Sequence, residues 1–202
     1  NKAIARCIEM VRDLGGRLFI VHMTTAEGVD MVGAARGAGL DVRAETCTHY
    51  LVFTEEMLHR ADGLKWICSP PLRDQATQDR LWAALGDGRL SQVTSDDAAY
   101  TWEATLYGRD RFDLCPNGMG GIEPRFPIMY SEGVAKGRLS LPQFVELVAT
   151  NPARNFGLYP QKGTLLPGAD ADIVLFNPSA KWTMGQANSH SNNDWHAYEG
   201  IE

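Results

Sequence analysis

The chain has 202 residues, of which 44% are hydrophobic and 22% charged, and its formal net charge is −6. This is the composition of a globular protein with enough apolar material for a sizeable core. Lysine and arginine are scattered without a basic run, which argues against nucleic acid and anionic membranes as partners, and no apolar stretch approaches the roughly 18 residues that a membrane span needs.

The first half of the chain alternates between helical and strand patterns. Apolar residues at three- and four-residue steps predict helices over residues 3–14, 25–37 and 74–86, with a short helix over 53–60. Short apolar runs predict strands over residues 18–21, 42–47, 66–68 and 90–94. The strands begin near residues 18, 42, 66 and 90, so each step is 24 residues. This spacing favours an α/β fold with parallel strands, either half of an eight-unit barrel or most of an open sheet.

The pattern changes after residue 97. A Pro-Asn-Gly turn at 116–118 precedes a helical pattern over residues 122–156. Residues 162–168 and 172–176 predict two strands, whereas residues 179–202 are polar and show no core pattern. His190 and His196 in this tail are expected to be solvated. The four cysteines are widely spaced without a C-x-x-C pair, which indicates buried free thiols and a reducing, cytoplasmic environment.

Three polar side chains follow predicted strands at the point where each strand ends. They are His22, His49 and Asp96. Because the carboxyl ends of parallel strands open onto one face, we expect these side chains to converge. Two imidazoles and a carboxylate are ligands that a catalytic zinc ion prefers. The spacing alone leaves open that each histidine is a hydrogen-bonded structural group.

Short motifs occur in a fixed order along essentially the whole chain. They are V-H-M-T-T (21–25), E-T-C-T-H-Y-L (45–51), C-S-P-P-L-R (68–73), T-S-D (94–96), P-N-G (116–118), G-I-E (121–123), N-P-A (151–153), F-G-L-Y-P (156–160), K-G (162–163) and G-A-D-A-D (168–172). This ordered set resembles the C-terminal portion of the dihydropyrimidinase/D-hydantoinase family of cyclic amidohydrolases. The resemblance implies an α/β fold: the second half of a (β/α)8 TIM-type barrel over residues 1–160, and part of a small C-terminal β-rich domain over residues 161–202.

The resemblance also implies roles for individual residues. His22 and His49 match two histidines that bind one ion of a binuclear Zn²⁺ centre, and Asp96 matches the aspartate that binds the other ion and carries the proton. Ser69 and Asn117 match positions whose backbone groups hold the cyclic amide of the substrate. Asp97 stands where the family commonly has histidine.

Some family features cannot be placed in this sequence. The His-x-His pair of the first barrel strand, the carboxylated lysine that bridges the metals and an upstream tyrosine all lie outside this chain. We therefore expect the 202 residues to be an incomplete fragment that alone binds at most one metal ion weakly and has no useful catalysis.

The resemblance implies a cyclic-amide substrate, two zinc ions and a homo-oligomer, usually a tetramer in this family. Two alternatives stay open. The first is a non-catalytic scaffold relative that acts through protein–protein assembly, although retention of His22, His49 and Asp96 argues against it. The second is a sister enzyme, an allantoinase or a dihydroorotase. The C-S-P-P-L-R and P-N-G segments favour the hydantoinase branch.

Overall fold

The computed structural model describes residues 1–202 apart from the side chain of Phe112. The helices and strands are α1 (Lys2–Leu14), β1 (Arg17–Ile20), α2 (Ala26–Gly37), β2 (Asp41–Cys47), α3 (Thr48–Val52), α4 (Gln75–Gly86), β3 (Gln92–Thr94), α5 (Trp102–Leu106), α6 (Ile122–Ile128), α7 (Leu141–Val145) and α8 (Asn151–Asn155). Short 3₁₀ turns lie at Glu55–His59, Gly63–Trp66, Phe112–Leu114 and Gln186–Asn188, and π-helical turns at Met129–Val134 and Glu146–Thr150.

The described residues form a three-stranded parallel sheet in the order β1-β2-β3. Leu18 of β1 lies opposite Val42 of β2, and Glu45 of β2 lies opposite Gln92 of β3. The prediction of an α/β fold with parallel strands is confirmed. Because β2 and β3 run in the same direction side by side, their carboxyl ends meet at one edge of the sheet.

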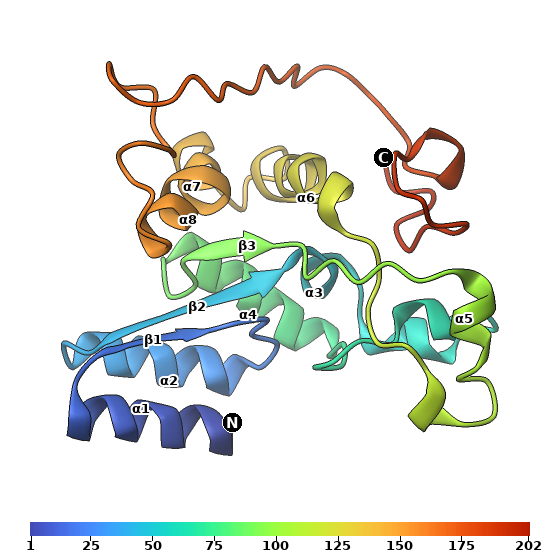
Figure 1. The fold of residues 1–202 in the computed structure, drawn as a ribbon, viewed down its shortest axis with the longest axis horizontal. Helices are drawn as coiled ribbons and strands as arrows, with labels where there is room; N and C mark the ends of the chain where they lie inside the picture. Colours follow the sequence, from blue (N-terminus) through green and yellow to red (C-terminus); the bar gives the residue numbers. More distant parts are fainter.

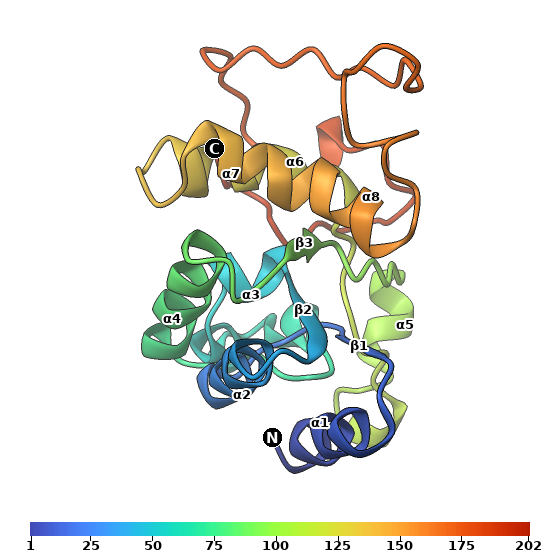
Figure 2. The ribbon, with the colours of Figure 1, turned by 90° about the vertical axis from the view of Figure 1, so that its left-hand side faces the viewer.

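Helices lie on both sides of this sheet. Helices α1, α2 and α4 lie on one side, and α6, α7 and α8 lie on the other, nearest to β3 (Figures 1 and 2). Helices α2 and α4 begin at side-chain caps, because Thr25 accepts a hydrogen bond from the amide of Gly28, and Asp74 accepts one from the amide of Thr77. No helix in the described chain is long and apolar enough to cross a bilayer.

One of the two predicted elements between β2 and α4 is wrong. The short helix expected over residues 53–60 is present as the 3₁₀ helix Glu55–His59, and α3 precedes it from Thr48. The strand expected over residues 66–68 is absent from the described chain, since Trp66 ends a 3₁₀ turn. A strand needs a continuous ladder, and Pro70 and Pro71 remove two of the backbone donors that would extend one here. The 24-residue spacing is therefore interrupted at the third of its four predicted strands.

The two strands predicted after residue 160 are also absent from the described chain. Residues 164–176 run along one side of the molecule without forming a helix or strand, and the chain turns at residues 166–169 (Figure 1). Its apolar side chains are exposed, with Leu175 94% and Val174 71% accessible. Phe176 anchors the segment, because its ring lies 4.6 Å from the ring centroid of Tyr130 and 5.2 Å from that of Phe126. An apolar run forms a strand only when a neighbouring strand supplies its backbone partners.

The tail over residues 184–201 contributes to the core, contrary to the prediction that residues 179–202 have no core pattern. Met184, Trp195, Ala197 and Tyr198 are buried, and Tyr198 is fully inaccessible. The ring of Tyr198 lies 4.9 Å from that of Phe53. His196 is likewise buried, although His190 is exposed as predicted. Widely spaced anchors of this kind follow no period, so hydrophobic periodicity does not reveal them.

Candidate functional site

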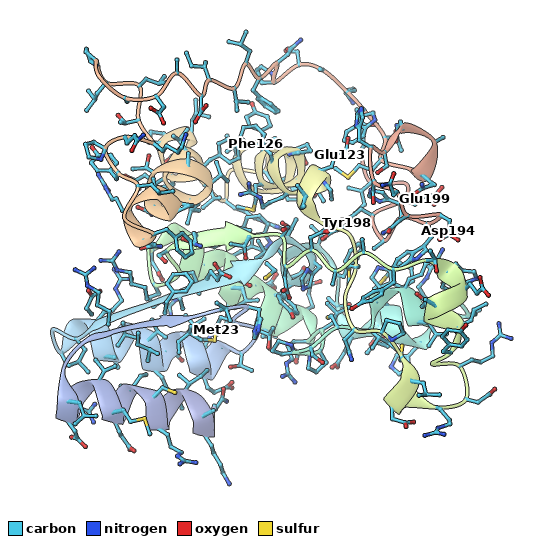
Figure 3. The ribbon with its side chains drawn as sticks, in the orientation of Figure 1. Met23, Glu123, Phe126, Asp194, Tyr198 and Glu199 are labelled. Carbon is cyan, nitrogen blue, oxygen red and sulfur yellow. The ribbon has the colours of Figure 1, made fainter. Side chains whose placement is uncertain are left out.

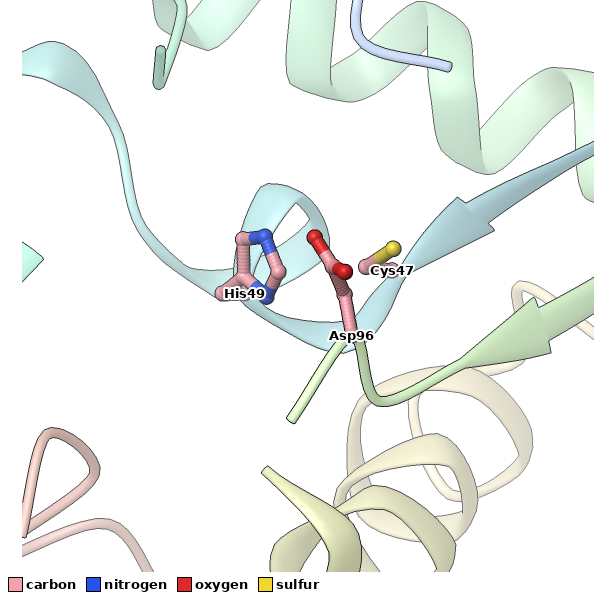
Figure 4. A group of neighbouring side chains, drawn as sticks. All are labelled: Cys47, His49 and Asp96. Carbon is pink, nitrogen blue, oxygen red and sulfur yellow. The ribbon is translucent and has the colours of Figure 1, made fainter. Parts of the chain in front are cut away.

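A cluster of three polar side chains lies where β2 and β3 end. One ligand atom from each of Cys47, His49 and Asp96 lies within 4.8 Å of the other two (Figure 4). Cys47 is the last residue of β2, His49 lies in the first turn of α3, and Asp96 follows β3 by two residues. The parallel pairing of β2 and β3 therefore brings His49 and Asp96 together, as the strand-end argument predicts.

His49 is buried without any hydrogen-bond partner. Its side chain is only 1% exposed, and both Nδ1 and Nε2 lack a partner among the described residues. Burial and the neighbouring charge of His22 lower the pKa of His49 to about 3, so the ring is neutral near pH 7. A buried polar group that lacks a partner costs on the order of 1–3 kcal/mol. A neutral imidazole with free nitrogens is the form in which histidine binds a metal ion.

His22 and Asp96 share an unusual backbone conformation. Their φ angles are 40° and 47°, and within the described part of the chain they are the two non-glycine residues with positive φ. A left-handed residue with a side chain is strained by about 1–2 kcal/mol, and such strain concentrates at functional sites. His22 is half-buried and lies close enough to His49 to influence its pKa, but it is not part of the mutually close set.

Cys47 is the member of the cluster that sequence reasoning assigned only to packing. Its side chain is fully buried, and its Sγ lies 3.5 Å from Oγ1 of Thr94. Burial, with a smaller contribution from Asp96, raises the pKa of the Cys47 thiol far above its ordinary value. The thiol is therefore neutral and unreactive near pH 7. Its position two residues before His49, at the end of a strand, was the only signal of its place in the site.

The two predicted substrate-binding residues lie together on adjacent loops. The Oγ of Ser69 donates to Oδ1 of Asn117 at 3.2 Å. The amide of Gly118 donates to the carbonyl of Ile67 at 2.8 Å, which joins the same two loops through the main chain. Cys68 precedes Ser69, and burial raises its pKa to about 11, so no nucleophilic role is assigned to it.

The residues of the cluster fit a divalent metal ion such as zinc. His49 offers two buried nitrogens without partners, and the exposed carboxylate of Asp96 lies beside them. Imidazole nitrogen and carboxylate oxygen are the donors that a catalytic zinc ion takes. A positive ion at this place would satisfy a ring nitrogen that the described chain leaves without a partner.

The lowered pKa of His49 predicts a pH dependence of stability for the zinc-free protein. In the unfolded chain this histidine takes up a proton below pH 6.5, whereas the folded chain resists it until about pH 3. Stability is therefore lost as the pH falls through this window, by up to about 1.4 kcal/mol per pH unit from this group. We expect His49→Gln to remove this contribution, so that the variant gains stability relative to the parent as the pH falls from 6.5 to 4. Urea unfolding with a chelator at several pH values would show it, and a constant difference would contradict it.

Comparison with known proteins places this geometry in a family. The sequence profile of the Amidohydrolase family matches residues 4–199. A D-hydantoinase from Ralstonia pickettii is 43% identical over 202 residues, which is 98% of this chain and 44% of that protein. A D-hydantoinase from Geobacillus stearothermophilus is 39% identical over 205 residues, again 44% of its length.

Solved structures agree with the sequence comparison. The crystal structure of a dihydropyrimidinase from Brevibacillus agri superimposes with a TM-score of 0.97 at 41% identity, covering 99% of this chain and 44% of that one. A D-hydantoinase from a Thermus species gives a TM-score of 0.96 at 33% identity. The chain thus spans less than half the length of these relatives. With the profile matching nearly every residue, the chain belongs to the amidohydrolase family, and its relatives include D-hydantoinases and dihydropyrimidinases.

Proposed function

We propose that these residues form the metal- and substrate-binding C-terminal portion of a zinc-dependent hydrolase that opens cyclic amide rings. The substrates would be dihydropyrimidines or 5-substituted hydantoins. The observation that carries this proposal is the pair of buried His49 nitrogens without partners beside the carboxylate of Asp96. The names of the relatives, which include D-hydantoinase and dihydropyrimidinase, support the substrate class.

The same proposal covers the architecture. Residues 1–160 would form the second half of a (β/α)8 barrel, and residues 161–202 part of a β-rich domain. The three parallel strands and the superposition on the dihydropyrimidinase structure support the first part. The exposed apolar segment over residues 164–176 supports the second, because its side chains are available to pack against further chain. The proposal also assigns a homo-tetramer and a second zinc ion to the whole protein, of which this chain is a part.

In the proposed reaction Asp96 moves the proton. Zinc, when bound, would lower the pKa of a water molecule and polarise the scissile carbonyl. His22 and His49 would hold one metal ion, and Asp96 would hold the other. The carboxylate of Asp96 accepts a proton from the attacking water while the water oxygen forms a bond to the carbonyl carbon. The carbon–nitrogen bond of the ring then breaks, and Asp96 returns that proton to the leaving nitrogen.

Ser69 and Asn117 would bind the substrate ring. Their loops are joined by the Ser69–Asn117 side-chain bond and by the main-chain bond from Gly118 to Ile67. Such a linked pair of turns presents backbone donors and acceptors in a fixed arrangement. A cyclic amide carries one N–H donor and one carbonyl acceptor side by side, so a matching backbone pair orients it for attack.

The test is ring opening by the full-length native polypeptide. We expect zinc-dependent hydrolysis of dihydrouracil or hydantoin, abolished by a chelator and restored by zinc, measured by loss of ring absorbance. The 202-residue chain alone should show no turnover. If the protein instead opens allantoin or dihydroorotate, it would be assigned to a related amidohydrolase, an allantoinase or a dihydroorotase. A full-length protein that binds no zinc would favour a scaffold, and zinc-stimulated turnover by the isolated chain would contradict the expected inactivity.

A further inference from the structure

We propose that Asp97 is a positioning residue whose carboxylate ties the segment that carries Asp96 to the loop that carries Asn117. The role rests on the proposed function, because it concerns the placement of residues assigned to that reaction.

The carboxylate of Asp97 reaches across to the start of α6. Its Oδ1 accepts hydrogen bonds from the amide of Gly121 at 2.7 Å and from the amide of Ile122 at 3.3 Å. The main chain adds to this link, because the amide of Ala98 donates to the carbonyl of Met119 at 3.1 Å. Amides in the first turn of a helix have no partner within the helix, so Asp97 supplies the acceptor that they lack.

The loop that ends at Gly121 has little freedom to move toward β3. A Cβ at Gly121 would lie 2.9 Å from the carbonyl oxygen of Ser95, and one at Gly118 would lie 2.4 Å from the Cβ of Ala98. The two backbones are therefore in close contact along residues 95–98 and 118–121. Asp97 is the charged side chain in this contact that bonds directly to the opposite backbone.

These bonds hold Asp96 in its strained conformation. Asp96 has a φ of 47° and is preceded by β3 and followed by Asp97. Strain of this kind persists only when the residues on both sides are fixed by other contacts. Without the two bonds to Asp97, the main-chain bond from Ala98 to Met119 remains, but the backbone at Asp96 loses the side-chain restraint that opposes its return to negative φ. Its carboxylate would then leave the position beside His49.

The tail supports the same junction from outside. Glu123 of α6 accepts from the amide of His190 at 2.9 Å, and Asp194 accepts from the amide of Trp102 at 2.7 Å. The indole of Trp195 donates to the carbonyl of Tyr100 at 2.8 Å. Figure 3 shows Glu123 and Asp194 on either side of the place where the tail meets α6 and the loop after β3. The tail contacts the loops, whereas the carboxylate of Asp97, next to Asp96 in sequence, bonds directly to the backbone at the start of α6.

The experiment compares four variants of the full-length, zinc-loaded protein. Asp97→Ala removes the acceptor, Asp97→Asn keeps an oxygen at the same place, Asp97→Glu keeps the charge but shifts the oxygen, and Glu103→Ala is a matched change at an exposed acid on α5. We expect Asp97→Ala and Asp97→Glu to lower kcat for ring opening by about 10- to 100-fold. Asp97→Asn should stay within about threefold of the parent, since a neutral oxygen still accepts both bonds, and Glu103→Ala should be unchanged.

A second readout is independent of catalysis. Hydrogen–deuterium exchange of the amides over residues 118–122 should be faster in Asp97→Ala than in the parent and near the parent in Asp97→Asn. Parent-like kcat and exchange in Asp97→Ala would overturn the proposal. An Asp97→Asn variant with a low kcat but parent-like amide exchange would also overturn it, because the charge of Asp97 would then matter instead of its hydrogen bonds. If Asp97→Ala does not fold, the contrast between Asp97→Asn and Asp97→Glu decides. If the parent opens no ring, the proposed function fails, while the exchange data still test the bonds of Asp97.

Discussion

Replacing Asp96 by asparagine in the full-length protein is expected to lower kcat for ring opening by about 10²- to 10⁴-fold, the range associated with loss of a general acid–base group. The amide cannot accept the proton of the attacking water, and it is a weaker zinc ligand than the carboxylate. Bound zinc should therefore also decrease. Initial rates with hydantoin and dihydrouracil, together with metal analysis of the purified variant, would measure both effects.

A glycine at position 96 separates the loss of the carboxylate from any loss of folding stability. Asp96→Gly removes the same carboxylate but accepts the φ of 47° without strain. We expect this variant to be as inactive as Asp96→Asn and, when zinc is removed from both proteins by a chelator, at least as stable to urea as the parent. A variant at position 96 that retained half of the parent's activity with full zinc content would remove Asp96 from the proposed mechanism.

The second large effect concerns stability. Tyr198→Ala is expected to lower the free energy of unfolding by about 3–5 kcal/mol, since it empties a fully buried aromatic position that packs against Phe53. Tyr198→Phe should be neutral or stabilising. The Tyr198 hydroxyl is buried and has no hydrogen-bond partner among the side chains that the structure describes, so its removal relieves a desolvation cost.

Urea unfolding of the full-length protein would measure these changes. Tyr107 provides a matched control because its side chain is 63% exposed, and Tyr107→Ala should change the unfolding free energy by less than about 0.5 kcal/mol. A Tyr198→Phe variant that loses as much stability as Tyr198→Ala would show that the hydroxyl has a bonding partner in the whole protein.

Local periodicity was sufficient for the helices and strands at the start of the chain. Helices α1, α2 and α4 and strands β1 and β2 lie within one or two residues of their predicted bounds. Each of them carries its own apolar pattern and, for α2 and α4, its own capping residue. The wrong predictions share a different property. Trp66 to Cys68 and Asp172 to Phe176 are apolar runs without a neighbouring strand in the described chain, and an apolar run alone does not determine backbone pairing.

The candidate site was predicted in part for a related reason. Placing polar residues at the ends of parallel strands predicted that His49 and Asp96 converge, and they do, because β2 and β3 pair in parallel and end at the same edge of the sheet. The expectation that polar residues at strand ends converge also included His22. His22 lies near His49 but outside the group of Cys47, His49 and Asp96 whose ligand atoms are all close to one another. The same expectation did not identify Cys47, since it considers side chains beyond the strand and Cys47 is the last residue of β2. The metal and substrate roles themselves stay predictions.

The contact between Phe53 and Tyr198 joins two positions separated by most of the chain. Met184 and Ile201 close the same tail onto itself, because the amide of Met184 donates to the carbonyl of Ile201. During synthesis, Phe53 leaves the ribosome long before its aromatic partner, so the apolar surface around α3 stays solvent-accessible until residue 198 has emerged. Contacts of such long sequence separation form slowly. The nascent protein therefore exposes the apolar residues around Phe53 until Tyr198 is available, and chaperone binding would matter most during that period.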